Sequence, residues 1–258
     1  LLGLSGLYQD CTLFLRPTHG GAGRGLCFLR IKRLETESMR LRHIPGSEDF
    51  VREAASVVNA PERYRGNWST FFRKEAPLAL EIGMGKGRFL RELSAREPER
   101  NFLGLERYAS VLQKAIERKE REEREREKRE RENLYFLWVD AKRLTEIFAP
   151  GEVARIYLNF SDPWPKAGHA MRRLTSSEFL KLYDAVLAPE GEIWFKTDND
   201  GLFEWSLEEI PAAGWVLQDV TRDLHRDVPA EENVMTEYEE KFSARGQKIS
   251  RLIATRKK

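Results

Sequence analysis

Short apolar runs that alternate with segments of helical periodicity constrain the fold of this chain more than any other feature of its sequence. The first runs, such as LALEIG at residues 78–83 and NFLGLE at 101–106, are apolar on both faces, as strands inside a parallel sheet are. Strand followed by helix in repetition predicts an α/β fold with a doubly wound sheet, which binds ligands beyond the carboxyl ends of its strands. We expect strands at residues 78–83, 101–106, 134–140, 154–161, 191–198, 215–220 and 249–255.

One of the intervening helices has clear signals at both ends. The stretch TSSEFLKLYDAVLAPEG begins with Thr175 and Glu178 at the spacing of a capping box, and Pro189 and Gly191 mark its end. Its apolar residues recur at helical spacing and predict the face that packs on the sheet: Phe179, Leu180, Tyr183, Val186 and Leu187.

The first 38 residues differ from the rest of the chain. They have a glycine-rich middle and no period of a strand or a helix, and the first methionine is Met39. We expect residues 1–38 to be a non-native or disordered extension, with a genuine partner-binding arm as the alternative. Residues 39–258 are then a single domain, in which 39–77 lead into the fold.

Composition narrows the class of protein. Charged residues make up 33% of the chain but the formal net charge is only +2, so a nucleic-acid-binding surface would have to be local. No apolar run has the length of a membrane span, and no signal peptide is visible. The two cysteines, Cys11 and Cys27, lack metal-ligand or redox spacing. We expect a cytoplasmic protein with reduced cysteines, no metal and no membrane partner.

One segment, from Glu117 to Glu132, consists only of charged residues, eight acidic and eight basic. Glu120 and Arg124 illustrate its i,i+4 pairs, each worth about 0.2 to 0.5 kcal/mol. We interpret the segment as a solvated extension of a helix rather than as an RNA-binding surface, since only apolar residues before it can pack on a sheet.

A glycine-rich turn, EIGMGKG at residues 81–87, lies directly after the first expected strand. Its glycines, Gly83, Gly85 and Gly87, allow a tight turn and close approach of a ligand to the backbone. The spacing excludes a dinucleotide fingerprint, whose last glycine would fall on Arg88. Glu81, inside the strand end, would repel a pyrophosphate and suits a cationic or amine-bearing ligand.

Acidic residues also close the next two strands. Glu106 is placed to accept hydrogen bonds from ribose hydroxyls, and Asp140 can receive an adenine amino group. Each carboxylate alone is more often a cap or a solvated loop residue. Three on successive strand ends indicate a ligand site.

The segment NFSDPWPKAGHAMRRL, residues 159–174, places Asp162 at another strand end and follows it with basic side chains. Lysines and arginines are usually solvated, but these lie where the ligand crevice of such a sheet opens. Phosphate contacts position a nucleic acid without reading its sequence. We therefore expect this loop to hold RNA, with Asp162 as a turn cap as the structural alternative. Its basic residues are Lys166, His169, Arg172 and Arg173.

These motifs resemble those of a known family. The acidic, glycine-rich site resembles that of class I S-adenosylmethionine-dependent methyltransferases. DPWPKAGHAMRRL, together with EIGMGKG, FKTDN and TEYEEKF, is similar to the bacterial tRNA (guanine-N7)-methyltransferase family, over roughly Met39 to the C-terminus. The chain departs from that family in its N-terminal extension, its charged segment and Ser161, where a proline or similar residue often stands.

The resemblance implies a Rossmann-like methyltransferase sheet of seven mostly parallel strands, with an antiparallel last strand and helices on both faces. It implies S-adenosyl-L-methionine as cofactor, bound by the glycine-rich turn and by Glu81, Glu106, Asp140 and Asp162. It further implies a substrate site for tRNA at Lys166, Asp198, Thr236, Glu237, Tyr238 and Glu239, and an RNA-contacting loop from Gly168 to Arg173 that includes His169 and Arg172. The implied target is the variable-loop guanine at tRNA position 46.

The chemistry of guanine N7 agrees with this assignment. N7 attacks with a lone pair in the ring plane and has no proton to lose, so the enzyme needs alignment rather than a strong base. Positive charge moves onto the purine, and a fixed carboxylate opposes that charge; Asp162 is the expected catalytic residue. A methyltransferase of another substrate and a non-catalytic tRNA-binding protein remain the alternatives. We expect a monomer or homodimer without an obligate protein partner.

Overall fold

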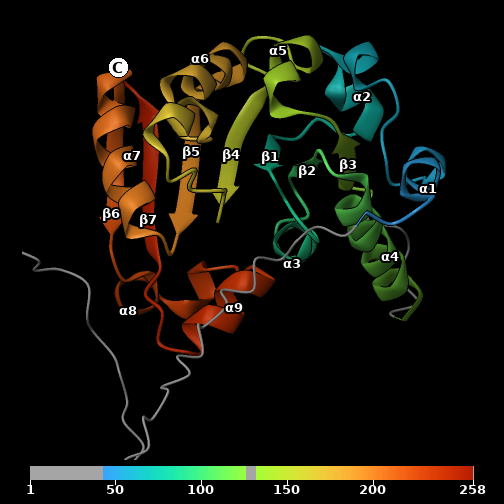
Figure 1. Cartoon of the computed structure of the whole chain (residues 1–258). Coiled ribbons are helices and arrows are strands. Elements are labelled where there is room, and N and C mark those ends of the chain that lie inside the picture. Colours follow the sequence, from blue (N-terminus) through green and yellow to red (C-terminus); the bar gives the residue numbers. More distant parts are fainter. Residues whose placement is uncertain (1–42, 126–131, 258) are drawn as a thin grey trace, which may run out of the picture. The chain divides into compact units, whose positions relative to one another are not determined.

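A computed structural model describes residues 43–125 and 132–257 of the chain. Its centre is a seven-stranded sheet of order β3-β2-β1-β4-β5-β7-β6, in which β7 runs in the opposite direction to the other strands (Figure 1). The predicted mostly parallel sheet with an antiparallel last strand is thereby confirmed. The strands are β1 Leu78–Ile82, β2 Asn101–Glu106, β3 Leu134–Trp138, β4 Val153–Asn159, β5 Leu187–Thr197, β6 Trp215–Thr221 and β7 Ser250–Arg256.

Helices cover both faces of the sheet, as the alternating side chains of its strands require. In β2, Phe102 joins an apolar cluster with Leu90 and Leu112, whereas its neighbour Leu103 joins a second cluster with Phe179. Successive strand residues point to opposite faces, so one run of apolar residues fills two cores. The helices are α1 Ser47–Glu53, α2 Trp68–Phe72, α3 Arg88–Arg96, α4 Ala109–Glu125, α5 Leu144–Ile147, α6 Ser177–Val186, α7 Asp200–Ala212, α8 Leu224–Asp227 and α9 Glu237–Ser243.

Helix α6 begins differently from its prediction. Thr175 does not cap it: its hydroxyl is buried and lies 2.8 Å from that of Ser206. The first helical N–H, of Ser177, donates instead to Glu209 of α7 at 2.9 Å. A tertiary contact thus replaces the local capping box. The chain then enters β5 directly at Leu187, earlier than Pro189 and Gly191 suggested.

The segment ahead of β1 covers the outer edge of β3. Phe136 of β3 donates its N–H to Ser56 at 2.8 Å and accepts one from Val58 at 2.9 Å, which adds a short parallel bridge to the sheet. Farther on, the buried Trp68 donates its indole N–H to Ile147 at 3.2 Å. The predicted extension, residues 1–38, lies outside the described residues.

The described part of the charged segment continues α4 to Glu125. Glu120 and Arg124 form an exposed pair at 3.8 Å, as predicted. Lys119, however, is buried with Glu123 at 2.8 Å, and Glu122 accepts from the buried Arg91 at 3.0 Å. Packing therefore extends beyond the last apolar residue of the helix. The predicted pairs that include residues 126–131 lie outside the described residues.

None of the helices in the described part of the chain combines the length and apolar character needed to cross a bilayer.

Candidate functional site

Glu81 lies near the carboxyl end of β1 and is almost completely buried, at 2% exposure. Asn159 of β4 donates to its Oε1 at 2.8 Å, whereas its Oε2 is buried without a hydrogen-bond partner among the described residues. Burial raises the pKa of Glu81 to about 8, although Asn159 and the charge of Lys196 oppose the rise. An incompletely satisfied buried carboxylate favours a cationic or hydrogen-bond-donating ligand.

The glycine-rich turn follows Glu81 directly. Gly83, Gly85 and Gly87 have φ values of 73°, 58° and 70°, in the left-handed region that other residues rarely adopt. A Cβ atom at Gly83 or Gly85 would meet nothing within 4 Å, so the backbone there is open to a ligand. The conformation, rather than crowding by the protein, therefore requires these glycines.

Gly104, in the middle of β2, is required for the opposite reason. A Cβ atom there would lie 2.1 Å from Sδ of Met84 and 2.8 Å from Cδ1 of Leu90. A side chain at position 104 would therefore have to displace the side chains of Met84 and Leu90. We did not predict a role for Gly104, because nothing in its local sequence distinguishes it from other strand glycines.

Glu106 ends β2 and Asp140 follows β3, so the three predicted carboxylates share one edge of the sheet. Glu106 is buried, which raises its pKa. Its Oε1 accepts the N–H groups of Arg107 and Tyr108 at 2.9 and 3.0 Å, and its Oε2 that of Gly85 at 3.2 Å. Glu106 therefore fixes the glycine-rich turn. Asp140 is exposed and accepts from the backbone of Lys142 at 2.9 Å.

Asp162 stands in an exposed loop three residues after β4 ends. The loop is held at its base by the N–H of Phe160, which donates to the carbonyl of Lys196 at 2.9 Å. Phe160 and Trp164 have positive φ values of 53° and 41°, costly for non-glycine residues. One left-handed residue on each side of Asp162 sets the direction in which the loop leaves the sheet.

Arg173 holds the far side of this loop. Its guanidinium group donates to the carbonyls of Pro163 and Trp164 at 3.0 and 3.1 Å and lies 4.4 Å above the ring centre of Trp205. These contacts are internal to the protein. The role of Arg173 as an RNA contact stays a prediction.

The other basic residues of the loop face solvent more openly. The Arg172 guanidinium lies 5.0 Å from the ring centre of Trp164, and the ring of His169 meets the same indole edge-on at 5.6 Å. Arg172 is exposed, as are Lys166 and Gly168. The loop thus presents cationic and aromatic groups together, which suits phosphate and base contacts.

The TEYEEKF segment supplies the N-cap and most of α9, and Thr236 accepts the N–H of Glu239 at 3.0 Å. The Tyr238 hydroxyl donates to Asp198 at 2.8 Å, and its ring lies 5.0 Å from that of Phe160. Burial, followed by Asp198, raises the pKa of Tyr238 to about 12. Two predicted substrate residues, Tyr238 and Asp198, are therefore linked through Phe160 to the loop that carries Asp162.

Ion pairs connect α9 to the glycine-rich turn and to α3 and α4. Glu237 lies 3.6 Å from Lys86 of the glycine-rich turn and also contacts Arg118 of α4, and Glu240 is bonded to Arg88 of α3. The sequence analysis assigned Glu237 to the substrate and did not predict these bridges.

Glu239 is completely buried, although it was predicted to contact the substrate. Its carboxylate meets Lys196 of β5 at 2.7 Å, the side-chain amide of Asn233 at 2.7 Å and His225 at 3.2 Å. A substrate contact of Glu239 stays a prediction. Lys196, Asn233 and Asn159 were missed; a lysine inside the apolar run EIWFKT was the one available signal for a buried charge pair.

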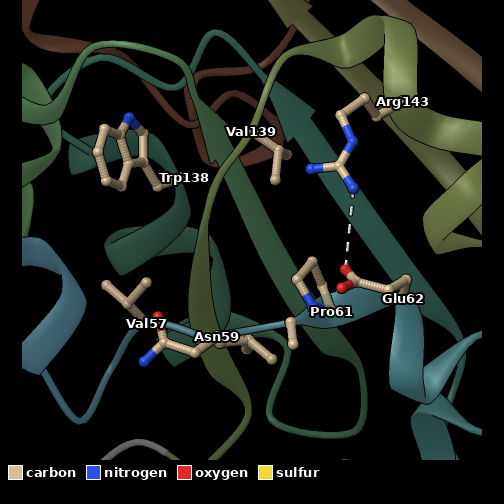
Figure 2. Close-up of a pocket in the computed structure, with 9 residues that line it drawn as sticks. Val57, Asn59, Pro61, Glu62, Trp138, Val139 and Arg143 are labelled. Atoms are coloured by element: carbon tan, nitrogen blue, oxygen red, sulfur yellow. Dashed lines mark ion pairs between the residues drawn. The ribbon is translucent and has the colours of Figure 1, made fainter.

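Two pockets lie elsewhere in the described structure. One, of about 300 Å³, borders the outer edge of β3, with Trp138 and Val139 on one side and residues 57–62 on the other (Figure 2). Glu62 and Arg143 face each other across it at 3.9 Å. The other, of about 420 Å³, lies between α6, the end of α7 and β7. No predicted site residue lines either pocket. No His, Cys, Asp or Glu cluster within residues 43–125 and 132–257 could hold a metal ion.

Comparisons with known proteins agree with this arrangement. A family model described as a putative methyltransferase matches residues 75–252. The chain is 52% identical over 220 residues to a tRNA (guanine-N(7)-)-methyltransferase of Lachnoclostridium phytofermentans, which covers 85% of this chain and 100% of the relative. It is 46% identical to the protein of that name from Bacillus subtilis, over 83% of this chain and 97% of the relative.

Solved structures share the fold at low sequence identity. An antibiotic-related methyltransferase is 15% identical with a TM-score of 0.56, over 76% of this chain and 94% of the other. The 16S rRNA methyltransferase KamB is 19% identical with a TM-score of 0.55, over 75% of this chain and 94% of the other. These likenesses show the Rossmann-like methyltransferase fold alone.

Proposed function

The chain belongs to the bacterial tRNA (guanine-N7)-methyltransferase family, and from this membership we propose that it methylates N7 of the variable-loop guanine of tRNA, at position 46. The methyl donor is S-adenosyl-L-methionine. The protein acts in the cytoplasm as a monomer or homodimer, without an obligate protein partner.

We call the sheet edge with Glu81, Gly83, Gly85, Glu106 and Asp140 the donor edge, and its residues fit this cofactor. When bound, S-adenosylmethionine supplies an electrophilic methyl group on a positively charged sulfonium. The buried, unpartnered Oε2 of Glu81 and the open left-handed turn at Gly83 and Gly85 suit a cationic ligand that approaches the backbone closely. Glu106 and Asp140, on the adjoining strand ends, hold its ribose hydroxyls and its adenine amino group.

Asp162 is the catalytic residue of this proposal. Guanine N7 needs no base, so the side chain acts by position and charge: it orients the purine and opposes the positive charge that develops on it. Asp162 is solvent-exposed before substrate binds, and its electrostatic effect grows when the RNA excludes water from it. Tyr238 of α9 and Asp198, which follows β5, are hydrogen-bonded to each other and contact the guanine in this proposal.

The exposed loop supplies the RNA contacts. Lys166, His169 and Arg172 bind phosphates, and Trp164 offers a ring on which a base can stack. The guanine reaches Asp162 by leaving its own stack, since its N7 must meet a methyl group held at the strand ends.

One observation supports this function best: a buried acidic edge suited to the donor and an exposed cationic loop carrying Asp162 follow strands of the same parallel sheet. The experiment that tests it incubates the protein with labelled donor and unmethylated tRNA, then maps N7-methylguanine by chemical cleavage. We expect cleavage at the variable-loop guanine. Methylation of a small molecule or protein without turnover of tRNA would contradict the proposal, as would tRNA binding without methyl transfer.

A further inference from the structure

The ammonium group of Lys196 has three hydrogens, and all three donate to one short segment. Nζ lies 2.7 Å from Oε2 of Glu239, 2.9 Å from the carbonyl of Val234 and 3.1 Å from Oδ1 of Asn233. Lys196 itself belongs to β5 and is 6% exposed. Residues 233–239, which lead into α9, are therefore folded around a single charge fixed on the sheet.

The same charge also acts on the donor side. Lys196 is the register partner of Asn159 on β4, and Asn159 donates to Glu81 on β1. The positive charge of Lys196 favours the ionised form of Glu81 without a direct hydrogen bond between them. Glu81, Asn159 and Lys196 thus follow one another across three adjacent strands, β1, β4 and β5.

The backbone of Lys196 makes a third connection. Its carbonyl accepts the N–H of Phe160, at the base of the loop that carries Asp162. The Phe160 ring in turn packs against Tyr238 of α9 at 5.0 Å. One residue therefore contacts the start of the catalytic loop and the start of the substrate-side helix.

We propose that Lys196 is a positioning residue that couples the two halves of the site: its ammonium group anchors residues 233–239 and supplies the positive charge that faces Glu81. This inference rests on the proposed function for its substrate side. Glu239 belongs to the same device, because it compensates the charge that Lys196 could not otherwise keep in a buried position. A bound cation ionises Glu81 and pairs with it, so Glu239 is left as the carboxylate that balances Lys196, and donor binding tightens residues 233–243.

The first test replaces Lys196 with methionine, which keeps the length of the side chain and removes its charge. Donor affinity, measured by calorimetry at pH 7.5, should fall about tenfold or more, because Glu81 loses its positive neighbour. Hydrogen exchange of residues 233–243, followed by mass spectrometry, should become faster and lose its response to the donor. Unchanged donor affinity together with unchanged exchange would overturn the proposal.

A second variant, Lys196→Arg, separates the two actions and remains informative if Lys196→Met does not fold. Arginine keeps the charge, so donor affinity should stay within about threefold, but its planar fork does not match three acceptors around one point. Hydrogen exchange of residues 233–243 should be as fast as in the Lys196→Met variant. KM for tRNA should rise, while kcat changes less. Equal donor affinities of the Arg and Met variants would show that the charge does not act on Glu81 and would overturn the coupling.

Lys119→Met is the matched control. Lys119 is also buried and paired with one glutamate, Glu123 at 2.8 Å, but lies on α4. The Lys119→Met variant should leave donor affinity and exchange of residues 233–243 unchanged. An effect as large as that of Lys196→Met would overturn the assignment to Lys196. Failure of the unsubstituted protein to methylate tRNA would refute the proposed function instead, and the donor-affinity and exchange comparisons would still decide this inference.

Discussion

The donor edge and the catalytic loop differ in how their functional side chains are held. Glu81 and Glu106 are buried in strands and bonded to neighbouring strands or turns, so the sheet fixes their positions before any ligand arrives. Asp162 is exposed, and the loop around it depends on Arg173 and on two left-handed residues. The sheet therefore holds the edge in place, whereas the loop is held by contacts within itself and with Trp205.

The two kinds of carboxylate also differ in how much they destabilise the protein before a ligand binds. A buried carboxylate with a raised pKa destabilises the protein that carries it, and the cost is recovered on binding a cation. An exposed aspartate costs little in the free protein and acts only once the substrate surrounds it. Substitutions on the two sides should therefore change different quantities.

The largest effect is expected at Asp162. Asp162→Asn keeps the shape and removes the charge, so single-turnover methyl transfer at saturating donor and tRNA should fall about 10² to 10³-fold. Donor and tRNA affinities should change only a few-fold, because the charge matters most as the purine becomes cationic. Rapid-quench kinetics beside equilibrium binding measure both. A rate close to that of the unsubstituted protein would remove Asp162 from the chemistry.

Glu81→Gln should have the next largest effect, on donor affinity. The loss should be about ten- to a hundredfold, since the amide cannot attract a cation. In the unsubstituted protein, ionisation of Glu81 makes donor affinity rise with pH up to about 8, and the variant should lose this dependence. Calorimetry from pH 6 to 9 tests it; a pH dependence that survives the substitution would place the titrating group elsewhere.

The same substitution should have the opposite effect on stability without donor. The folded pKa of about 8 lies above the ordinary value of 4.5, so the folded state retains a proton that the unfolded state releases. Stability is therefore lost as pH rises from about 4.5 to 8, and the penalty is complete above 8. At pH 9 the Glu81→Gln variant should be more stable by about 2 to 4 kcal/mol. Denaturant unfolding of both proteins at pH 5 and 9 measures the difference. If the variant and the unsubstituted protein were equally stable at both pH values, the raised pKa of Glu81 would be contradicted.

Substitutions of the two adjacent arginines of the loop should have moderate effects on different quantities. Arg172→Ala should weaken tRNA binding a few-fold and lower the slope of log affinity against log salt by about 1, with an unchanged melting temperature. Arg173→Ala should lower the melting temperature by a few degrees, because two backbone carbonyls lose their donor. If Arg173→Ala changed only the salt slope, Arg173 would be an RNA contact after all.

The smallest effect is expected in the exposed part of α4. Replacing Glu120 and Arg124 together by glutamine removes a surface pair with N and O 3.8 Å apart. Stability should change by less than about 0.5 kcal/mol, and tRNA affinity should not change. A marked loss of tRNA affinity would show that the charged segment binds RNA, contrary to our interpretation of it.

The fold was predictable because each strand carries its own signal. Residues 101–106 were predicted with their exact bounds, and the other strands within a few residues, since apolar runs between glycines and helical segments need no tertiary information. The clustering of Glu81, Glu106 and Asp140 at one edge followed from parallel order alone.

Contacts between distant segments could not be predicted in this way. Capping of α6 by Glu209 depends on how α7 packs, and the burial of Glu239 depends on Lys196, 43 residues earlier in the chain. Arg173 has the same composition signal as Arg172, yet it points toward carbonyls of its own loop. Charged residues carry no marker in the sequence for whether their partner is the protein, the solvent or a ligand.

The bridges from α9 to Lys86, Arg88 and Arg118 affect how a salt titration of tRNA binding can be interpreted. Added salt lowers the entropy gained when counterions leave the phosphates and, at the same time, screens these partly exposed intramolecular pairs. The slope of log affinity against log salt therefore includes a contribution from ion pairs within the protein, in addition to that of the phosphate contacts. The contribution of the ion pairs cancels when a loop variant is compared with the unsubstituted protein, so differences between slopes, not the slopes themselves, count phosphates.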